Sequence, residues 1–304
     1  MNCKHCYVPR QYKGVDVAFD AANELLNEFS NNGILKIVYT HGEVFLHPRW
    51  RDILSTASAW GFAQSILTNG LLVSEDVAQC IESLPQTRVV VSIDSASDAK
   101  HVANRRNPYA WEGLVNGLEI LRRHGIRVGA STVLTDQTSG ELEEIAGFCR
   151  EFGIADLYFL PHHSYSFKKL TDQEIETLAA RLFAVSTKFR GRCSFHIHDP
   201  LMRRSLQVRE GTVARDSCGA GLDYVAIFPN GDAFPCNFLH FRLGNVFSTS
   251  LSSVLQKATD LMREAEVQIL SECGGCLHVD NCGGGCKAFG FSDNSFHRDG
   301  RCQL

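Results

Sequence analysis

Amphipathic segments alternate with short apolar runs over the first 190 positions of the chain. Apolar residues recur every three or four positions in five segments, which predicts helices near 18–31, 49–60, 74–84, 111–125 and 139–153. Five runs rich in β-branched residues predict strands, each followed by a helix, at 35–40, 65–70, 88–94, 127–135 and 156–161. A capping box from Thr171 to Glu174 then begins a helix that extends to about residue 190.

Strands and helices that alternate at this spacing form parallel βαβ units, in an open doubly wound sheet or in a full or partial (β/α) barrel. Barrel enzymes place their chemistry at the carboxyl ends of the strands. Polar residues collect at these ends: His41-Gly42-Glu43, Thr68-Asn69-Gly70, Ser92-Ile93-Asp94, Ser131-Thr132 and Pro161-His162-His163. Each group alone is also typical of an ordinary polar loop.

The pattern becomes irregular after about residue 190. The stretch DYVAIFPNGDAFPCNF at 223–238 predicts a β-hairpin that turns at Pro229–Asp232, and a helix is expected near 251–265. From Cys273 onward the chain is rich in Gly and Cys and has little apolar periodicity, so we expect bound metal to order it. We therefore expect a barrel domain at 1–190, a connecting segment at 191–217 and a cysteine-rich domain at 218–304.

Charge and composition limit the partners and the compartment. The 304 residues have a formal net charge of -4 and no block of Lys and Arg, which disfavours a nucleic-acid partner. No apolar run reaches the roughly 18–20 residues that a membrane helix needs, so we expect a cytoplasmic protein. In that reducing compartment, closely spaced cysteines bind metal or perform redox chemistry more often than they form disulfides.

Seven of the 12 cysteines form a pattern near the C-terminus. Cys218 and Cys236 fit the pattern C-x12-G-x4-C. A run with the pattern C-x2-C-x5-C-x3-C follows, formed by Cys273, Cys276, Cys282 and Cys286. The seventh cysteine is Cys302. Thiolates at such spacings converge on a metal centre, and the spacing alone leaves zinc and iron–sulfur clusters open. Cys80 and Cys149 lie in helical patterns and are interpreted as small buried hydrophobic residues.

This array resembles the SPASM extension of radical S-adenosylmethionine (SAM) enzymes, and Cys3-Lys4-His5-Cys6 resembles the end of that superfamily's C-x3-C-x-aromatic-C loop. The resemblance implies an α/β fold, a partial (β/α)6 TIM-like barrel, followed by a small cysteine-rich α+β domain. The resemblance then implies a first cysteine four residues before Cys3, so that Met1 would be an internal residue of the loop. It also implies that the first strand of the barrel is missing from the sequence. Without that cysteine we expect no SAM cleavage; a natural two-cysteine variant is the alternative.

The resemblance also implies three [4Fe-4S] clusters. Cys3 and Cys6 would hold the SAM-binding cluster. Three thiolates would hold a first auxiliary cluster, and four would hold a second; these sets are Cys218, Cys236 and Cys286, and Cys273, Cys276, Cys282 and Cys302. The fourth iron of the first auxiliary cluster would be open to substrate or held by Cys193 or His196.

Four positions are implied as SAM contacts. Gly42 and Glu43 match the second and third residues of the family's G-G-E-P motif, although His41 and Val44 replace its outer residues. Ser92 lies in the segment that approaches SAM. Arg105, four residues after His101, would pair the SAM carboxylate through a guanidinium fork. The alternative for Arg105 is a solvated arginine in a basic loop, and no catalytic residue is assigned.

The implied activity is reductive cleavage of SAM to a 5′-deoxyadenosyl radical, which abstracts hydrogen from a peptide, a protein or a small metabolite. An electron donor such as flavodoxin or ferredoxin would supply the electron. Two alternatives stay open. One is a degenerate, non-catalytic iron–sulfur or zinc protein for electron transfer or partner binding, and the other is a zinc-stabilised barrel without redox function.

Overall fold

A computed structural model describes residues 3–162, 170–212 and 218–303, so Met1 and His163 lie outside the described residues. The chain divides into two compact units. The first comprises the residues up to Leu160 together with Lys188–His196, and the second comprises Pro161–Thr187 and Ile197–Leu304. The predicted limits of the domains at 190 and 217 stay a prediction.

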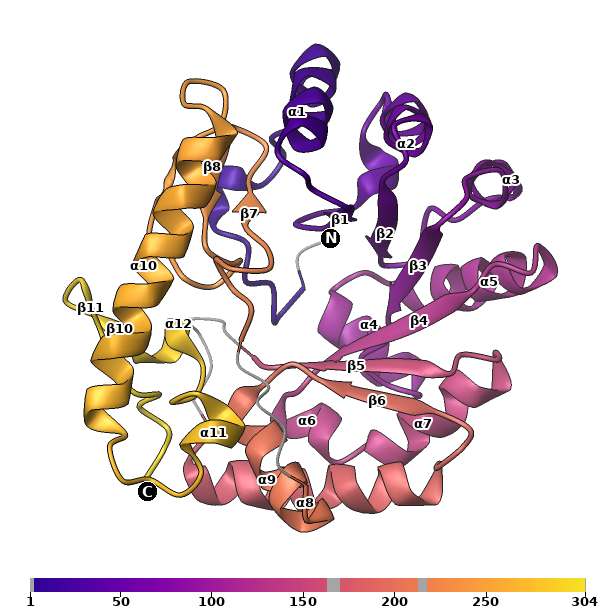
Figure 1. The fold of residues 1–304 in the computed structure, drawn as a ribbon. Coiled ribbons are helices and arrows are strands. Elements are labelled where there is room, and N and C mark those ends of the chain that lie inside the picture. Colours follow the sequence, from indigo (N-terminus) through magenta and orange to yellow (C-terminus); the bar gives the residue numbers. More distant parts are fainter. Residues whose placement is uncertain (1–2, 163–169, 213–217, 304) are drawn as a thin grey trace. The chain divides into compact units, whose positions relative to one another are not determined.

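A six-stranded sheet, counted over the described residues, forms the first unit, and its strands lie in sequence order. They are β1 (Lys36–Tyr39), β2 (Ala63–Thr68), β3 (Thr87–Ser92), β4 (Val128–Val133), β5 (Asp156–Leu160) and β6 (Ser194–Ile197). The pairs from β1 to β5 are parallel. Sequential order and parallel pairing give the curved, barrel-like sheet that the alternating pattern predicts (Figure 1).

Helices connect the strands of this unit: α1 (Phe19–Asn31), α2 (Trp50–Ala59), α3 (Glu75–Glu82), α4 (Asp98–Arg105), α5 (Ala110–Arg123), α6 (Asp136–Ser139) and α7 (Leu142–Glu151). Helices α1, α2, α3 and α5 line the outer side of the sheet (Figure 1). Their apolar faces supply fully buried side chains such as Leu54 and Leu114, and the strands supply Ile66, Val89 and Val91. Burial of these faces is the main stabilisation of the unit.

Two short 3-10 helices, η1 (Arg10–Tyr12) and η2 (Val44–Leu46), lie in the loops before α1 and after β1. Helix α4, strand β6 and the helix at 200–210 were not predicted. The irregular connection expected after residue 190 is wrong for Ser194–Ile197, which is β6, and for α9 (Pro200–Glu210). Asp199 accepts hydrogen bonds from the backbone N–H of Leu201 and Met202, so a side-chain cap and a proline at the first helical turn begin α9 despite its weak apolar pattern.

The second unit combines helices with small β-elements. Its helices are α8 (Asp172–Lys188), α9, α10 (Leu251–Glu272), α11 (Val279–Cys282) and α12 (Lys287–Gly290), and its strands are β7 (Ala226–Ile227), β8 (Asp232–Phe234), β9 (Gly244–Asn245), β10 (Phe291–Ser292) and β11 (Ser295–Phe296). The predicted hairpin is confirmed, because β7 and β8 pair antiparallel and Gly231 turns the chain at φ +86°. The capping box is also confirmed: Thr171 N–H donates to Glu174 at 2.8 Å, and Glu174 N–H donates to Thr171 at 3.3 Å.

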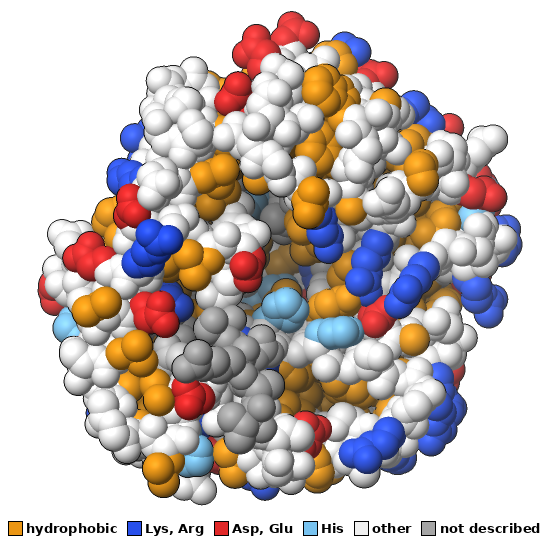
Figure 2. Space-filling model, in the orientation of Figure 1, with side chains coloured by type: hydrophobic (Ala, Val, Ile, Leu, Met, Phe, Trp, Pro, Cys, Tyr) orange, Lys and Arg blue, Asp and Glu red, His pale blue; other side chains and the backbone are white. Residues whose placement is uncertain are grey.

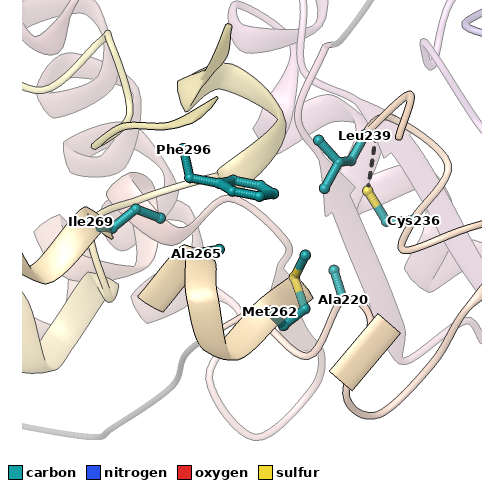
Figure 3. Packing of buried hydrophobic residues seen from close by; sticks show 7 residues of the cluster. All are labelled: Ala220, Cys236, Leu239, Met262, Ala265, Ile269 and Phe296. Atoms are coloured by element: carbon teal, nitrogen blue, oxygen red, sulfur yellow. Dashed lines mark hydrogen bonds between the residues drawn. The ribbon is translucent and has the colours of Figure 1, made fainter. Parts of the chain in front are cut away.

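Helix α10 is one turn or more longer than predicted and forms the core of this unit. Figure 3 shows Met262, Ala265 and Ile269 on one face of the helix, packed against Leu239 and Phe296. Cys236 belongs to the same buried cluster, and its sulfur accepts a hydrogen bond from the backbone N–H of Leu239. A predicted metal ligand is therefore anchored in the apolar core.

The surface carries charges of both signs. On the face in Figure 2, Lys and Arg side chains occur together with Asp and Glu side chains, in agreement with the small net charge of -4. Among the described helices, none combines the length and the apolar character that crossing a membrane requires.

Candidate functional site

Four of the predicted cysteine ligands line one cavity of about 450 Å³ in the second unit. They are Cys273, Cys276, Cys282 and Cys302, and Arg204, Glu272, His278 and Arg298 are among the other lining residues. Burial, followed by the neighbouring sulfurs of Cys282, Cys276 and Cys302, raises the pKa of Cys273. Thiolates that repel one another in this way are stabilised by a shared cationic centre.

Glycines let the backbone wrap around this cavity. Gly284 has φ +78°, and a Cβ atom there would lie 2.0 Å from Cγ2 of Ile269 and 3.6 Å from the sulfur of Cys273. A side chain at position 284 would therefore clash with Ile269 on one side and approach the predicted ligand Cys273 on the other. The wrapped loop is what brings Cys282 beside the C-x2-C pair.

The remaining three cysteines gather around another point of the same unit. The sulfur of Cys236 accepts hydrogen bonds from the N–H groups of Phe238, at 3.4 Å, and Leu239, at 3.2 Å. Burial raises the pKa of Cys236 to about 11, and these two N–H groups oppose the shift. The pKa of Tyr224 is raised by burial and then by Cys218, Cys236 and Cys286, so its phenol lies near all three thiols.

The backbone of Cys286 is fixed by a buried ion network. Its N–H donates to Asp299 at 2.9 Å, and Arg301 pairs with Asp299 at 2.7 Å and with Asp199 at 2.6 Å. Asp199 and Asp299 have no exposed surface. Because Arg301 is adjacent to Cys302, this network joins a ligand of one predicted cluster to a ligand of the other.

The chemistry of the donors limits which metal centres the two cysteine sets could hold. In residues 3–162, 170–212 and 218–303, no three side chains of His, Cys, Asp or Glu lie close enough together to hold one ion. A tetrahedral zinc site needs sulfurs about 3.8 Å apart, because each Zn–S bond is about 2.3 Å. A four-iron cluster carries one thiolate on each iron and spreads its sulfurs more widely. Sets of three and four thiols, without a carboxylate or an imidazole among them, fit iron–sulfur clusters by the type of donor.

The N-terminal cysteines lie beside α4 in the first unit. Cys6 N–H donates to the carbonyl of Cys3 at 3.3 Å in a tight turn, and Lys4 N–H donates to the carbonyl of Asn104 at 2.9 Å. The second hydrogen bond connects the cysteine loop to the end of α4, one residue before Arg105. A helix that the sequence did not predict thus positions this loop.

Arg105 is buried at the same place and paired. Its Nε lies 2.7 Å from Oδ2 of Asp94, and its Nη1 lies 3.9 Å from the sulfur of Cys3. His5 Nε2 lies 3.7 Å from the same oxygen of Asp94. Burial raises the pKa of Asp94, but Arg105 and His5 outweigh it and hold the pKa below its usual value. The alternative of a solvated arginine is wrong, since the side chain is only 8% exposed.

Glu43 fixes the loop that follows β1. Its carboxylate accepts hydrogen bonds from Thr68 Oγ1 and from Asn69 N–H, each at 2.9 Å, at the carboxyl end of β2. Burial raises the pKa of Glu43, while these bonds and the charge of Arg105 oppose the shift. Gly42 has open space, with no atom within 4 Å of a Cβ position, and His41 takes the left-handed conformation at φ +69°.

The other predicted residues lie at strand ends. Ser92 ends β3 in register with Ser131 of β4 and is half-buried. His196 bonds to Asp156 at 3.1 Å, and Cys193 donates weakly to the carbonyl of Ile154 at 3.9 Å, and all four residues belong to the first unit. Their role as cluster ligands stays a prediction.

Sequence reasoning assigned no role at these sites to four residues: His5, Asp94, Arg204 and Tyr224. The sequence contained a signal for Asp94: this residue ends the predicted strand RVVVSID, and the neighbouring predicted strands also end in polar residues. Arg204 had no signal, since its helix was not predicted.

Two family models match the chain. The model of the radical SAM superfamily matches residues 1–149, and that of an iron–sulfur cluster-binding domain, SPASM, matches residues 218–277. The chain contains a radical SAM domain and a SPASM domain. Radical SAM and SPASM domains bind [4Fe-4S] clusters, and solved radical SAM neighbours hold SAM, so both are cofactors of this family. The SPASM match includes Cys218, Cys236, Cys273 and Cys276.

Curated relatives of this radical SAM protein cover nearly all of the chain. An AdoMet-dependent heme synthase of Nitratidesulfovibrio vulgaris is 24% identical over 97% of this chain and 86% of its own length. The antilisterial bacteriocin subtilosin biosynthesis protein AlbA of Bacillus subtilis is 24% identical over 99% of this chain and 68% of its own length. The radical SAM homologues are enzymes, and they differ in what they make.

A solved radical SAM structure has the same fold. The SuiB protein of Streptococcus suis, bound to its precursor peptide SuiA, matches with a TM-score of 0.78 at 18% identity, over 100% of this chain and 73% of that chain. The predicted α/β fold with a small SPASM region is thereby confirmed.

Proposed function

We propose that this protein is a radical SAM/SPASM enzyme that modifies a peptide or protein substrate. The observation that carries the proposal is the assembly of Cys3, Asp94 and Arg105, which are far apart in the sequence. Arg105 Nε is 2.7 Å from Asp94, and its Nη1 is 3.9 Å from Cys3. A guanidinium group held beside a cluster ligand suits SAM, because the guanidinium can pair with the carboxylate of SAM while SAM chelates the cluster.

Each residue of this site has a distinct task in the proposal. Cys3 and Cys6 hold the N-terminal cluster. Asp94 orients Arg105, whose Nη groups pair with the carboxylate of SAM. The backbone at Gly42–Glu43 accommodates the ammonium group of SAM, and Ser92, at the end of β3, lies where SAM approaches the sheet. When bound and reduced, the cluster supplies the electron that cleaves SAM to methionine and the 5′-deoxyadenosyl radical.

The two C-terminal thiolate sets hold the auxiliary clusters in this proposal. Cys218, Cys236 and Cys286 form the first set, beside Tyr224, and leave one iron without a cysteine. Cys273, Cys276, Cys282 and Cys302 form the complete set. Hydrogen bonds from Phe238 and Leu239 to the sulfur of Cys236 stabilise its thiolate.

A peptide or protein substrate is favoured by two of the relatives. AlbA is a subtilosin biosynthesis protein, and SuiB is solved with the precursor peptide SuiA. The heme synthase supports the small-metabolite alternative. An electron donor such as flavodoxin or ferredoxin completes the proposed reaction.

A non-catalytic iron–sulfur protein for electron transfer is the second candidate. It is favoured by the left-handed His41, at φ +69°, in place of the glycine that begins the family motif. It is also favoured by the pairing of Arg105 with Asp94, which already neutralises the guanidinium.

One experiment separates the candidates. The full-length protein is purified and reconstituted anaerobically, iron and sulfide are counted, and 5′-deoxyadenosine is measured with dithionite and SAM. For protein that carries a cysteine four residues before Cys3, we expect cleavage, its loss in Arg105→Gln, and unchanged cleavage in Arg106→Gln, a neighbouring exposed arginine. Iron-loaded protein that forms no 5′-deoxyadenosine supports the electron-transfer candidate.

A further inference from the structure

Arg204 is a buried cation at the cavity of the complete cysteine set. Its side chain is 4% exposed, and its Nη1 donates to the sulfur of Cys302 at 3.6 Å. The residue lines the same cavity as Cys273, Cys276 and Cys282. It lies on α9, outside the cysteine motif and outside the residues of the SPASM match.

Carboxylates from α8 hold the guanidinium in place. Nη2 of Arg204 donates to Asp172 at 3.2 Å and to Glu176 at 3.3 Å. A buried guanidinium is costly unless it is paired and hydrogen-bonded. These two contacts occupy Nη2 and leave Nη1 for the sulfur.

Glu176 does not belong to Arg204 alone. It also accepts a hydrogen bond from Ser205 and pairs with Arg209 at 3.3 Å. Its negative charge is thus shared between two arginines. The two arginines and the two carboxylates, Asp172 and Glu176, carry equal and opposite formal charge, so the effect of Arg204 on the cavity comes from the Nη1–H that it directs at Cys302.

We propose that Arg204 sets the reduction potential of the second auxiliary cluster by donating a charge-assisted hydrogen bond to Cys302. This inference rests on the proposed assignment of a cluster to Cys273, Cys276, Cys282 and Cys302. Reduction adds one electron from the donor and no proton, so the cluster and its thiolates gain one negative charge. A fixed cation beside a ligand sulfur stabilises the more negative form and raises the potential.

Charge also predicts an effect of the opposite sign at Asp172. Asp172→Asn removes one of the charges that neutralise Arg204, so the guanidinium acts more strongly on the cluster. The potential should then rise, whereas Arg204→Gln should lower it. A residue that only joins α8, α9 and the C-terminal tail would not give two shifts of opposite direction.

The test is an EPR-monitored redox titration of the full-length, reconstituted protein, with iron and sulfide counted in every variant. We expect the feature of the second auxiliary cluster to move to lower potential in Arg204→Gln, to move less in Arg204→Lys, and to move upward in Asp172→Asn. Arg209→Gln is the matched control: this arginine pairs with the same Glu176 but lies 36% exposed, so solvent screens its charge and the potential should shift much less than in Arg204→Gln.

The outcomes separate this inference from the function on which it rests. Wild-type protein that does not load the second auxiliary cluster contradicts the proposed function. Loaded Arg204→Gln with the wild-type potential, or an equal shift in Arg209→Gln, overturns the inference. If Arg204→Gln does not load the cluster, Asp172→Asn decides, and an unchanged or lower potential in that variant overturns the inference.

Discussion

Nη1 of Arg105 lies 3.9 Å from the sulfur of Cys3, although the two residues are 102 positions apart. Helix α4 creates this proximity, because Arg105 is its last residue and the carbonyl of Asn104 accepts the N–H of Lys4 at 2.9 Å. The buried Asp94 completes the arrangement. The N-terminal cysteine loop is therefore held by contacts within the first unit, before any cluster is considered.

Asp94→Asn should destabilise the first unit strongly. It leaves the guanidinium of Arg105 buried without its counter-charge, and removal of one partner from a buried pair costs about 3–5 kcal/mol. The free energy of unfolding in urea measures the effect. Asp52→Asn is the control, since Asp52 is 48% exposed in its pair with Arg49 and should contribute less than about 1 kcal/mol. Equal effects of the two substitutions would disprove burial as the cause.

Gly42→Ala should weaken SAM binding without changing stability. A methyl group has open space there, with no atom within 4 Å, so the fold tolerates it. A ligand against the backbone would be overpacked by about 1–3 kcal/mol, which weakens binding about 5- to 150-fold. Calorimetric titration with SAM measures this, and Gly147→Ala, at a similarly open position on α7, is the control. Unchanged SAM affinity would place the ligand elsewhere.

Cys302→Ala should remove one auxiliary cluster. The seven C-terminal cysteines are expected to hold about eight irons, and loss of one ligand from the complete set should release about four. Iron and sulfide analysis after anaerobic reconstitution gives the count. Cys80→Ala, at a buried position on α3, should keep the full iron content. Loss of iron from both variants would indicate a general effect on folding.

Asp156→Asn should lower stability at neutral pH but not at acid pH. Burial raises the pKa of Asp156, but His196, Arg127 and Arg88 outweigh it and hold the pKa below its usual value. The contribution of this carboxylate is complete above about pH 3.9, its unfolded pKa, and is lost as pH falls through the folded pKa. We expect a loss of about 1.5–3 kcal/mol at pH 7 that shrinks as pH falls below about 4. Urea unfolding at several pH values tests this, and a pH-independent difference contradicts it.

The sequence predicted the elements whose burial leaves a local pattern. Buried parallel strands are nearly continuous apolar runs, and β3, with Val89 to Val91, has that form. Helix α9 lacks such a pattern because arginines such as Arg203 and Arg204 interrupt its apolar face. Its readable signal was the pair Asp199–Pro200, a cap followed by proline. The prediction of five strands missed β6, because its sequence SFHI has one β-branched residue, whereas β1, of the same length, has the adjacent pair Ile37 and Val38.

The residues of the candidate site also differ in whether a local sequence pattern reveals them. Cysteine spacing is a local property, so the seven C-terminal cysteines could be proposed as ligands from the sequence. The contact of Arg204 with Cys302 joins residues 98 positions apart, and that of Arg105 with Cys3 joins residues 102 apart. No local pattern encodes such pairs, because they depend on how helices return the chain to the site.

The buried pair of Asp199 and Arg301, which are 102 positions apart, constrains the order of events during synthesis. At about 5–20 residues per second, a ribosome needs roughly 5–20 s to reach Arg301 after it has added Asp199. Throughout that interval Asp199 has no counter-charge, so burying it would be unfavourable. The second unit should therefore remain open on the ribosome until Arg301 emerges, and cluster insertion into it should follow that event.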